Sequence, residues 1–172
     1  MFASWKSLED ISELKYFDAS NVTNMAIMLN GCALTDLSAI KNWDVSKVTN
    51  MYAMLGNNKF TEIDLSQWNI SEVTNMSGMF NGCQSVSNIN LSNWNTSKTT
   101  DMQGMFDGCS MLKTVYVSET FVTNQVSSSD MMFRNCMLIK GKEGTTYDEN
   151  KTDATMAWID GKDGKEGYFT AK

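Results

Sequence analysis

The apolar positions of this chain recur with a period of about 26 residues, a spacing typical of repeat proteins. One set of equivalent positions carries a large apolar residue in every unit: Leu8, Leu34, Phe60, Val86 and Leu112. A second set lies three residues further on and keeps the same interval: Ile11, Leu37, Ile63, Ile89 and Val115. The pattern therefore predicts an array of about five similar units.

Within each unit the apolar spacing changes from helical to strand-like. In the stretch SEVTNMSGMF, four apolar residues fall on one face of a short helix, namely Val73, Met76, Met79 and Phe80. A hydroxyl of Ser71 or Thr74 can cap this helix, and Gly82 can end it in a left-handed conformation. The following Ile-Asn-Leu at 89–91 alternates apolar and polar residues, which predicts a short strand.

A single unit of this kind cannot bury its apolar face, but stacked units can. The sequence therefore predicts an α/β solenoid, with short parallel strands on one face and short helices on the other. Fourteen methionines are present, and most fall on the repeated helix positions. Because methionine fills irregular gaps in a core, we expect packing positions rather than a cofactor site or a methionine-rich groove.

The repeat ends near residue 140, so we expect a solenoid over 1–140 and a C-terminal capping segment over 141–172. ATMAWI and GYFT in the tail predict a hairpin, with Trp158, Tyr168 and Phe169 covering the last unit. The array also starts inside a repeat, since Met1-Phe2 aligns with Met79-Phe80. Either residues 1–16 are an adapted cap, with Trp5 at a repeated cysteine position, or upstream units are missing. Because the chain starts inside a repeat, we expect it to be a fragment of a longer chain.

The pattern L-x-x-I-x-L-S-x-W-N-x-S-x-V-T-N-M-x-x-M-F-x-G-C resembles the bacterial surface-protein repeat of about 25 residues, in the BspA-like leucine-rich repeat group. This resemblance implies a right-handed, leucine-rich-repeat-like solenoid. It also implies an extracellular location on the bacterial cell surface or wall, with a role in adhesion and host contact. The chain departs from the pattern at Asn58, which replaces the cysteine, and at Ser129, which replaces the first methionine.

Composition excludes several classes of function. The net charge of −6 argues against a nucleic-acid partner, and no apolar run is long enough for this chain to insert into a membrane. Histidine is absent, which removes the commonest general base and metal ligand. The acids of the tail do not follow the calcium-loop order, and the other acids and serines follow the repeat. We therefore expect no catalytic site, no metal and no cofactor, and a chain that acts as a monomer.

Three cysteines occupy one position in successive units, namely Cys83, Cys109 and Cys136. Strands about 4.8 Å apart would place them within reach of disulfide formation. Cys32, however, has Trp5 and Asn58 as its neighbours at this position. A position that also accepts tryptophan and asparagine is a packing position, so buried free thiols are favoured over disulfides.

The residues between the apolar positions of each strand should face solvent and form two ladders. The candidate ligand-binding residues in these ladders are Asp36, Ser38, Glu62, Asp64, Asn88, Asn90, Thr114 and Tyr116. Solenoids use such extended faces for binding. The first hypothesis is a non-catalytic adhesion module that binds a protein or glycan of the host or matrix. The alternative is a structural spacer without a ligand of its own.

Overall fold

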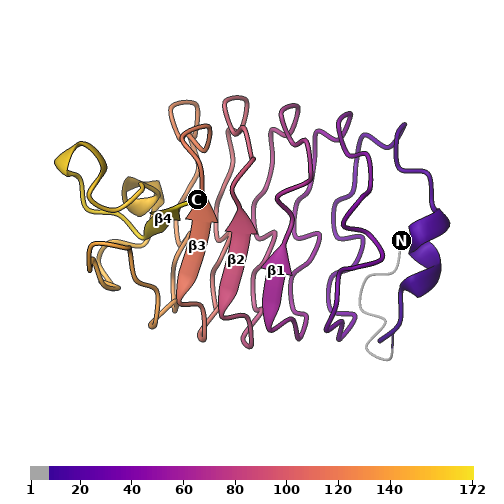
Figure 1. Ribbon diagram of the computed structural model, residues 1–172, viewed down its shortest axis with the longest axis horizontal. Coiled ribbons are helices and arrows are strands. Elements are labelled where there is room, and N and C mark those ends of the chain that lie inside the picture. The colour runs from indigo at the N-terminus through magenta and orange to yellow at the C-terminus, as the bar shows by residue number, and fades with distance from the viewer. Residues whose placement is uncertain (1–7) are drawn as a thin grey trace.

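The computed structural model describes residues 8–172, and its parallel sheet lies on one face of a stack of similar backbone turns (Figure 1). The sheet has the order β1-β2-β3-β4, with every neighbouring pair parallel. Its strands are β1 (Glu62–Asp64), β2 (Asn88–Leu91), β3 (Thr114–Val117) and β4 (Phe169–Ala171). Among the described residues, three short 3-10 helices lie outside the sheet: η1 (Ser12–Tyr16), η2 (Ala154–Met156) and η3 (Lys162–Gly164).

Equivalent residues of successive units pair with each other in the sheet. Ile63 of β1 pairs with Ile89 of β2, and Ile89 pairs with Val115 of β3. All three side chains are buried, so their predicted inward-facing positions are confirmed. The predicted alternation holds in β1 and β3 but not in β2, where Asn90 is buried as well. The equivalent segments of the first two units form no strand, and one of them is replaced by η1.

The predicted helices are absent within residues 8–172, because every second backbone N–H group of these segments bonds to the next unit instead of continuing a helix. The N–H groups of Met25, Ile27, Leu29 and Gly31 donate to Asn50, Tyr52, Met54 and Gly56 at 2.7 to 3.0 Å. Bridges between Asn24, Asn50, Asn75, Asp101 and Ser128 continue this second ladder along the stack. The hydroxyl of Thr74, which was expected to cap a helix, also forms a bond between units, since its Oγ1 donates to the carbonyl of Thr49.

The repeated methionines are core residues, as predicted. Met51, Met54, Met76 and Met79 are all buried within a single apolar cluster. Aromatic residues also align from unit to unit: the rings of Phe80, Phe106 and Phe133 stack with centroids 5.7 and 5.5 Å apart. Burial of apolar surface between units is therefore the main source of stability.

The tryptophans add a polar connection between units. Indole Nε1 of Trp43, Trp68 and Trp94 donates to a backbone carbonyl about one unit earlier, at 2.9 to 3.1 Å. Because a buried indole N–H needs an acceptor, this bond favours tryptophan over phenylalanine at the position.

The cysteines are buried and form no disulfide, which confirms the prediction of buried thiols. Cys83 Sγ lies 3.3 Å from the carbonyl oxygen of Leu55, and Asn58 Nδ2 donates to the equivalent carbonyl of Leu29. Asparagine can replace cysteine here because both side chains donate a hydrogen bond to the preceding unit. Burial raises the pKa of Cys83 to about 11 and that of Cys136 to about 12, so both thiols stay protonated at neutral pH.

The tail covers the last unit, but the predicted hairpin is wrong. The strand β4 adds to β3 in parallel, and Ile159 forms a parallel bridge with Phe169. Tyr168 and Phe169 are fully buried against Phe133, as expected of covering residues. Trp158 is only half-buried, with the ammonium of Lys165 3.6 Å from its ring centre. The alignment of Met1-Phe2 and the placement of Trp5 lie outside the described residues.

Gly82 supplies a test of the stacking because its φ is +71° and its neighbour is very close. A Cβ at this position would lie 2.3 Å from Oδ1 of Asn57. Gly82→Ala should lower the free energy of unfolding by about 1–2 kcal/mol from the left-handed backbone alone, and further from the displaced Asn57. Urea denaturation measures this change. The matched control is Gly164→Ala, with φ +72° and no neighbour within 4 Å. Equal losses in the two variants would contradict the close contact between units.

Candidate functional site

An open groove on the sheet, here called the strand-face groove, has a volume of about 430 Å³. Seven of the eight candidate residues from the ladders line it: Asp36, Ser38, Glu62, Asp64, Asn88, Asn90 and Tyr116. Thr114 is half-buried and is not among the residues that line it. Lys41 and Lys172 also line the groove and were not identified from the sequence. The groove therefore combines carboxylates, amides, a phenol and two ammonium groups.

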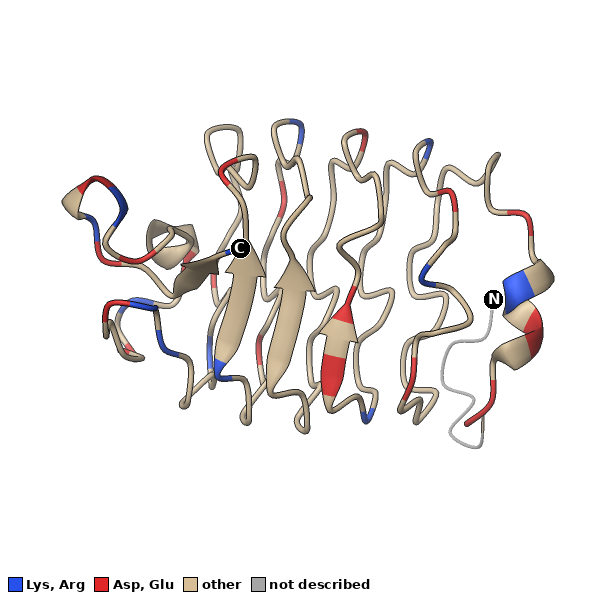
Figure 2. Cartoon of the chain, in the orientation of Figure 1, with Lys and Arg blue, Asp and Glu red and all other residues tan. Residues whose placement is uncertain are grey.

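Strand register brings these side chains together. Asp64 pairs with Asn90, and Asn90 pairs with Tyr116 on the next strand. Glu62 and Asn88 form the parallel row two residues earlier. Since neighbouring strands lie about 4.8 Å apart, one side chain from each unit enters the groove at regular intervals. Figure 2 shows the acidic β1 beside β2, which carries no charged residue.

Asp64 is the most restrained carboxylate in the groove. Its Oδ1 accepts hydrogen bonds from Ser66 N at 3.0 Å, Ser66 Oγ at 2.7 Å and Asn90 Nδ2 at 3.0 Å. Partial burial raises the pKa of Asp64, but the bonds from Ser66 and Asn90, with the nearby charge of Lys172, outweigh it and lower the pKa overall. The carboxylate is thus ionised and fixed in direction at neutral pH.

The alternation along β2 predicts that Asn90 faces solvent, and this prediction is wrong. Asn90 is only 8% exposed. Its Nδ2 donates to Asp64 Oδ1, and its Oδ1 accepts from the N–H of Ser92, so the buried amide is hydrogen-bonded at both ends. Its role is to orient Asp64. The neighbouring Asn88 is half-buried, and its Nδ2 donates to Glu62 Oε1 at 3.3 Å.

Lys172 reaches the groove because the tail returns to the sheet. Its backbone N–H donates to Val117 O at 3.0 Å, and its Nζ lies 5.2 Å from the ring centre of Tyr116. The sequence pattern contains no signal for this contact, since parallel addition of β4 to β3 joins segments about 50 residues apart. Lys41 is exposed and lies in the turn that follows Leu37 in the second unit.

A second hollow, here called the turn-face trough, has a volume of about 450 Å³ and lies over the turns of several units. Exposed apolar side chains line it, namely Ile27, Tyr52 and Met131. Two of its amides are already paired: Asn30 Nδ2 donates to Ala53 O at 2.9 Å, and Asn57 Nδ2 donates to Asn30 Oδ1 at 3.3 Å. These pairs leave it with fewer polar groups for a ligand, so the strand-face groove is the stronger candidate.

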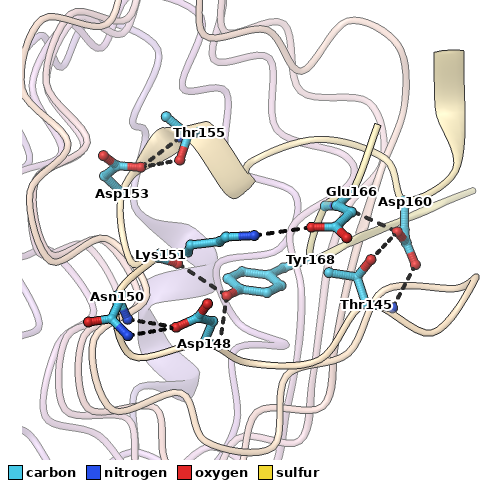
Figure 3. A network of polar contacts seen from close by, with 10 residues as sticks. Thr145, Asp148, Asn150, Lys151, Asp153, Thr155, Asp160, Glu166 and Tyr168 are labelled. Atoms are coloured by element: carbon cyan, nitrogen blue, oxygen red, sulfur yellow. Dashed lines mark hydrogen bonds and ion pairs between the residues drawn. The ribbon is translucent and has the colours of Figure 1, made fainter. Parts of the chain in front are cut away.

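Asp160 of the capping segment has a structural role. Asp160 accepts a hydrogen bond from Thr145 Oγ1 at 2.6 Å (Figure 3). It also accepts from the N–H groups of Glu143, Thr145 and Gly167. Partial burial raises the pKa of Asp160, but these bonds outweigh it and lower the pKa overall. Tyr168 Oη donates to the carbonyl of Lys151 at 3.1 Å within the same segment.

Within residues 8–172, histidine, cysteine and acidic side chains do not gather in threes that could hold a metal ion. In the same part of the chain, every helix is too short or too polar to cross a bilayer.

This arrangement defines a protein built from short repeats, with a polar groove across its strands. The chain belongs to the family described as Mycoplasma protein of unknown function, DUF285, whose model matches residues 1–116 and again 58–158. The two overlapping matches agree with an internally repeated sequence. Searches of curated proteins and of solved structures return no significant match.

The pKa of Asp64 tests the geometry of the groove. We expect its titration midpoint, followed by NMR of the side-chain carboxyl, to lie below the ordinary value of 3.8. Ionised Asp64 then adds to the free energy of unfolding at pH values above 3.8. This stabilisation is lost as the pH falls through the lowered pKa of the folded protein. Asn90→Ala removes one donor and should raise the midpoint. A wild-type midpoint at or above 3.8 would show that the donors do not hold this carboxylate.

Proposed function

We propose that this chain is a non-catalytic interaction module of a bacterial cell-surface protein. It binds a host or extracellular-matrix macromolecule, a protein or a glycan, through the strand-face groove. The observation that carries this proposal is the meeting of seven predicted ladder residues in a single groove.

We propose a right-handed solenoid of the BspA-like, leucine-rich-repeat type, in which the short turns take the place of helices. The parallel sheet and the second ladder of hydrogen bonds, both with a spacing of about 26 residues, support it. The proposed location is the bacterial cell surface, with the module acting as a monomer.

A structural spacer is the second candidate function. Two ladders of bonds between units, together with a continuous apolar core, favour a stiff rod that could hold another domain at a distance. A spacer needs no ligand, so changes in the strand-face groove would not affect it.

Charge reversal in the groove separates the two functions. The variant Asp36→Lys/Glu62→Lys changes two exposed carboxylates, whereas Asn90 is buried and unsuitable for lysine. A binding module should lose at least about ten-fold in affinity for whichever matrix protein or host glycan it binds, since groups at the centre of a site dominate affinity. Surface plasmon resonance against a panel of both classes measures this.

The matched control is Asp130→Lys/Glu149→Lys, which changes the net charge equally but lies outside the groove. Equal binding by the wild type and both double variants would move the binding site away from this face. Absence of binding across the whole panel would favour the spacer.

A further inference from the structure

The strand-face groove offers hydrogen-bond acceptors that are fixed in direction and remain available. Asp64 uses Oδ1 for its bonds to Ser66 and Asn90, and Glu62 uses Oε1 for Asn88. Within residues 8–172, neither Asp64 Oδ2 nor Glu62 Oε2 accepts a hydrogen bond or joins an ion pair. These two oxygens are therefore free to accept from a ligand without first breaking a bond within the protein.

Donors lie beside these acceptors. The hydroxyl of Tyr116 bonds to no residue of the described chain, and the ammonium groups of Lys41 and Lys172 line the same groove. A sugar hydroxyl both donates and accepts, as serine and threonine hydroxyls do. A row of hydroxyls can therefore satisfy carboxylates, phenol and ammonium groups along one path.

The mixed charge of the groove disfavours strongly charged partners. A polycation would meet Lys41 and Lys172, while a polyanion would meet Asp36, Glu62 and Asp64. Like charges brought together at an interface cost several kcal/mol. The neighbouring β2 strand contributes only uncharged side chains to the groove, Asn88 and Asn90. An uncharged ligand avoids both penalties and keeps the hydrogen bonds.

Tyr116 supplies a rigid apolar surface next to these polar groups. Its strand lies between β2 and β4, and its side chain is half-buried. A tyrosine ring combines an apolar body with a polar tip, and it loses little conformational entropy on binding. The carbon face of a sugar ring can pack on such a surface while its hydroxyls reach the carboxylates.

We infer that the strand-face groove takes an uncharged glycan chain, an inference that rests on the proposed binding function. The hydroxyls bond to Glu62, Asp64 and Asn88, and a sugar ring packs against Tyr116. Lys172 lines the groove beside Tyr116, with its Nζ 5.2 Å from the ring centre. A basic or acidic protein segment is the competing partner.

The experiment is binding of the full chain to an array of uncharged glycans, followed by titration calorimetry with the tightest binder. Heparin and poly-lysine serve as polyanionic and polycationic probes. We expect selective binding to uncharged glycans, and a loss of about ten-fold in affinity for Tyr116→Ala, as for the removal of a central aromatic. Tyr52→Ala is the matched control, because Tyr52 is exposed in the turn-face trough and should bind as the wild type does.

The outcomes separate this inference from the proposed function. Binding of proteins or poly-lysine that Asp36→Lys/Glu62→Lys abolishes, with no binding to uncharged glycans, would overturn the inference and leave the binding module standing. Glycan binding that Tyr116→Ala leaves unchanged would also overturn the assignment to this groove. Absence of binding to every glycan, protein and charged probe would remove the proposed function itself.

Discussion

The structure depends on backbone hydrogen bonds between equivalent residues of successive units. On one face these bonds form the parallel sheet, and on the other every second N–H group of a unit donates to a carbonyl group of the next. A helix would use the same N–H groups within its own turn, so helix and stack compete for them. The stack is favoured because it also buries the apolar positions of every unit against their equivalents, as the aligned phenylalanine rings show.

This constraint also creates the candidate site. Because units stack in register, one polar side chain per unit is repeated across the sheet at strand spacing. Sequence variation at these positions then changes the chemistry of the face without disturbing the core, since the neighbouring positions point inward. The capping segment closes the stack and at the same time places Lys172 beside Tyr116. The cap is therefore part of the site as well as part of the fold.

The sequence predicted the structure well wherever the repeat period alone determines which side chains are buried and which are aligned. It predicted the buried ladder at Ile63, Ile89 and Val115, the buried thiols and seven of the residues that line the groove. The prediction of helices failed because the same apolar spacing fits both a helix and a series of turns. Val73, Met76 and Met79 are buried in the turns, as they would be on one face of a helix. The sequence also failed for β4 and Lys172, which occur once and leave no periodic signal.

The most direct test of this account is amide hydrogen exchange in a central unit, read residue by residue by NMR. The N–H groups of Met51, Ala53 and Leu55 donate to Asn75, Ser77 and Met79 of the next unit, so they should exchange as slowly as the amides of β2. The N–H of Tyr52 donates to the side chain of Asn50 in an exposed position and should exchange faster. Fast exchange at all four amides, or equally slow exchange at all four as in a helix, would contradict stacking through bonds between units.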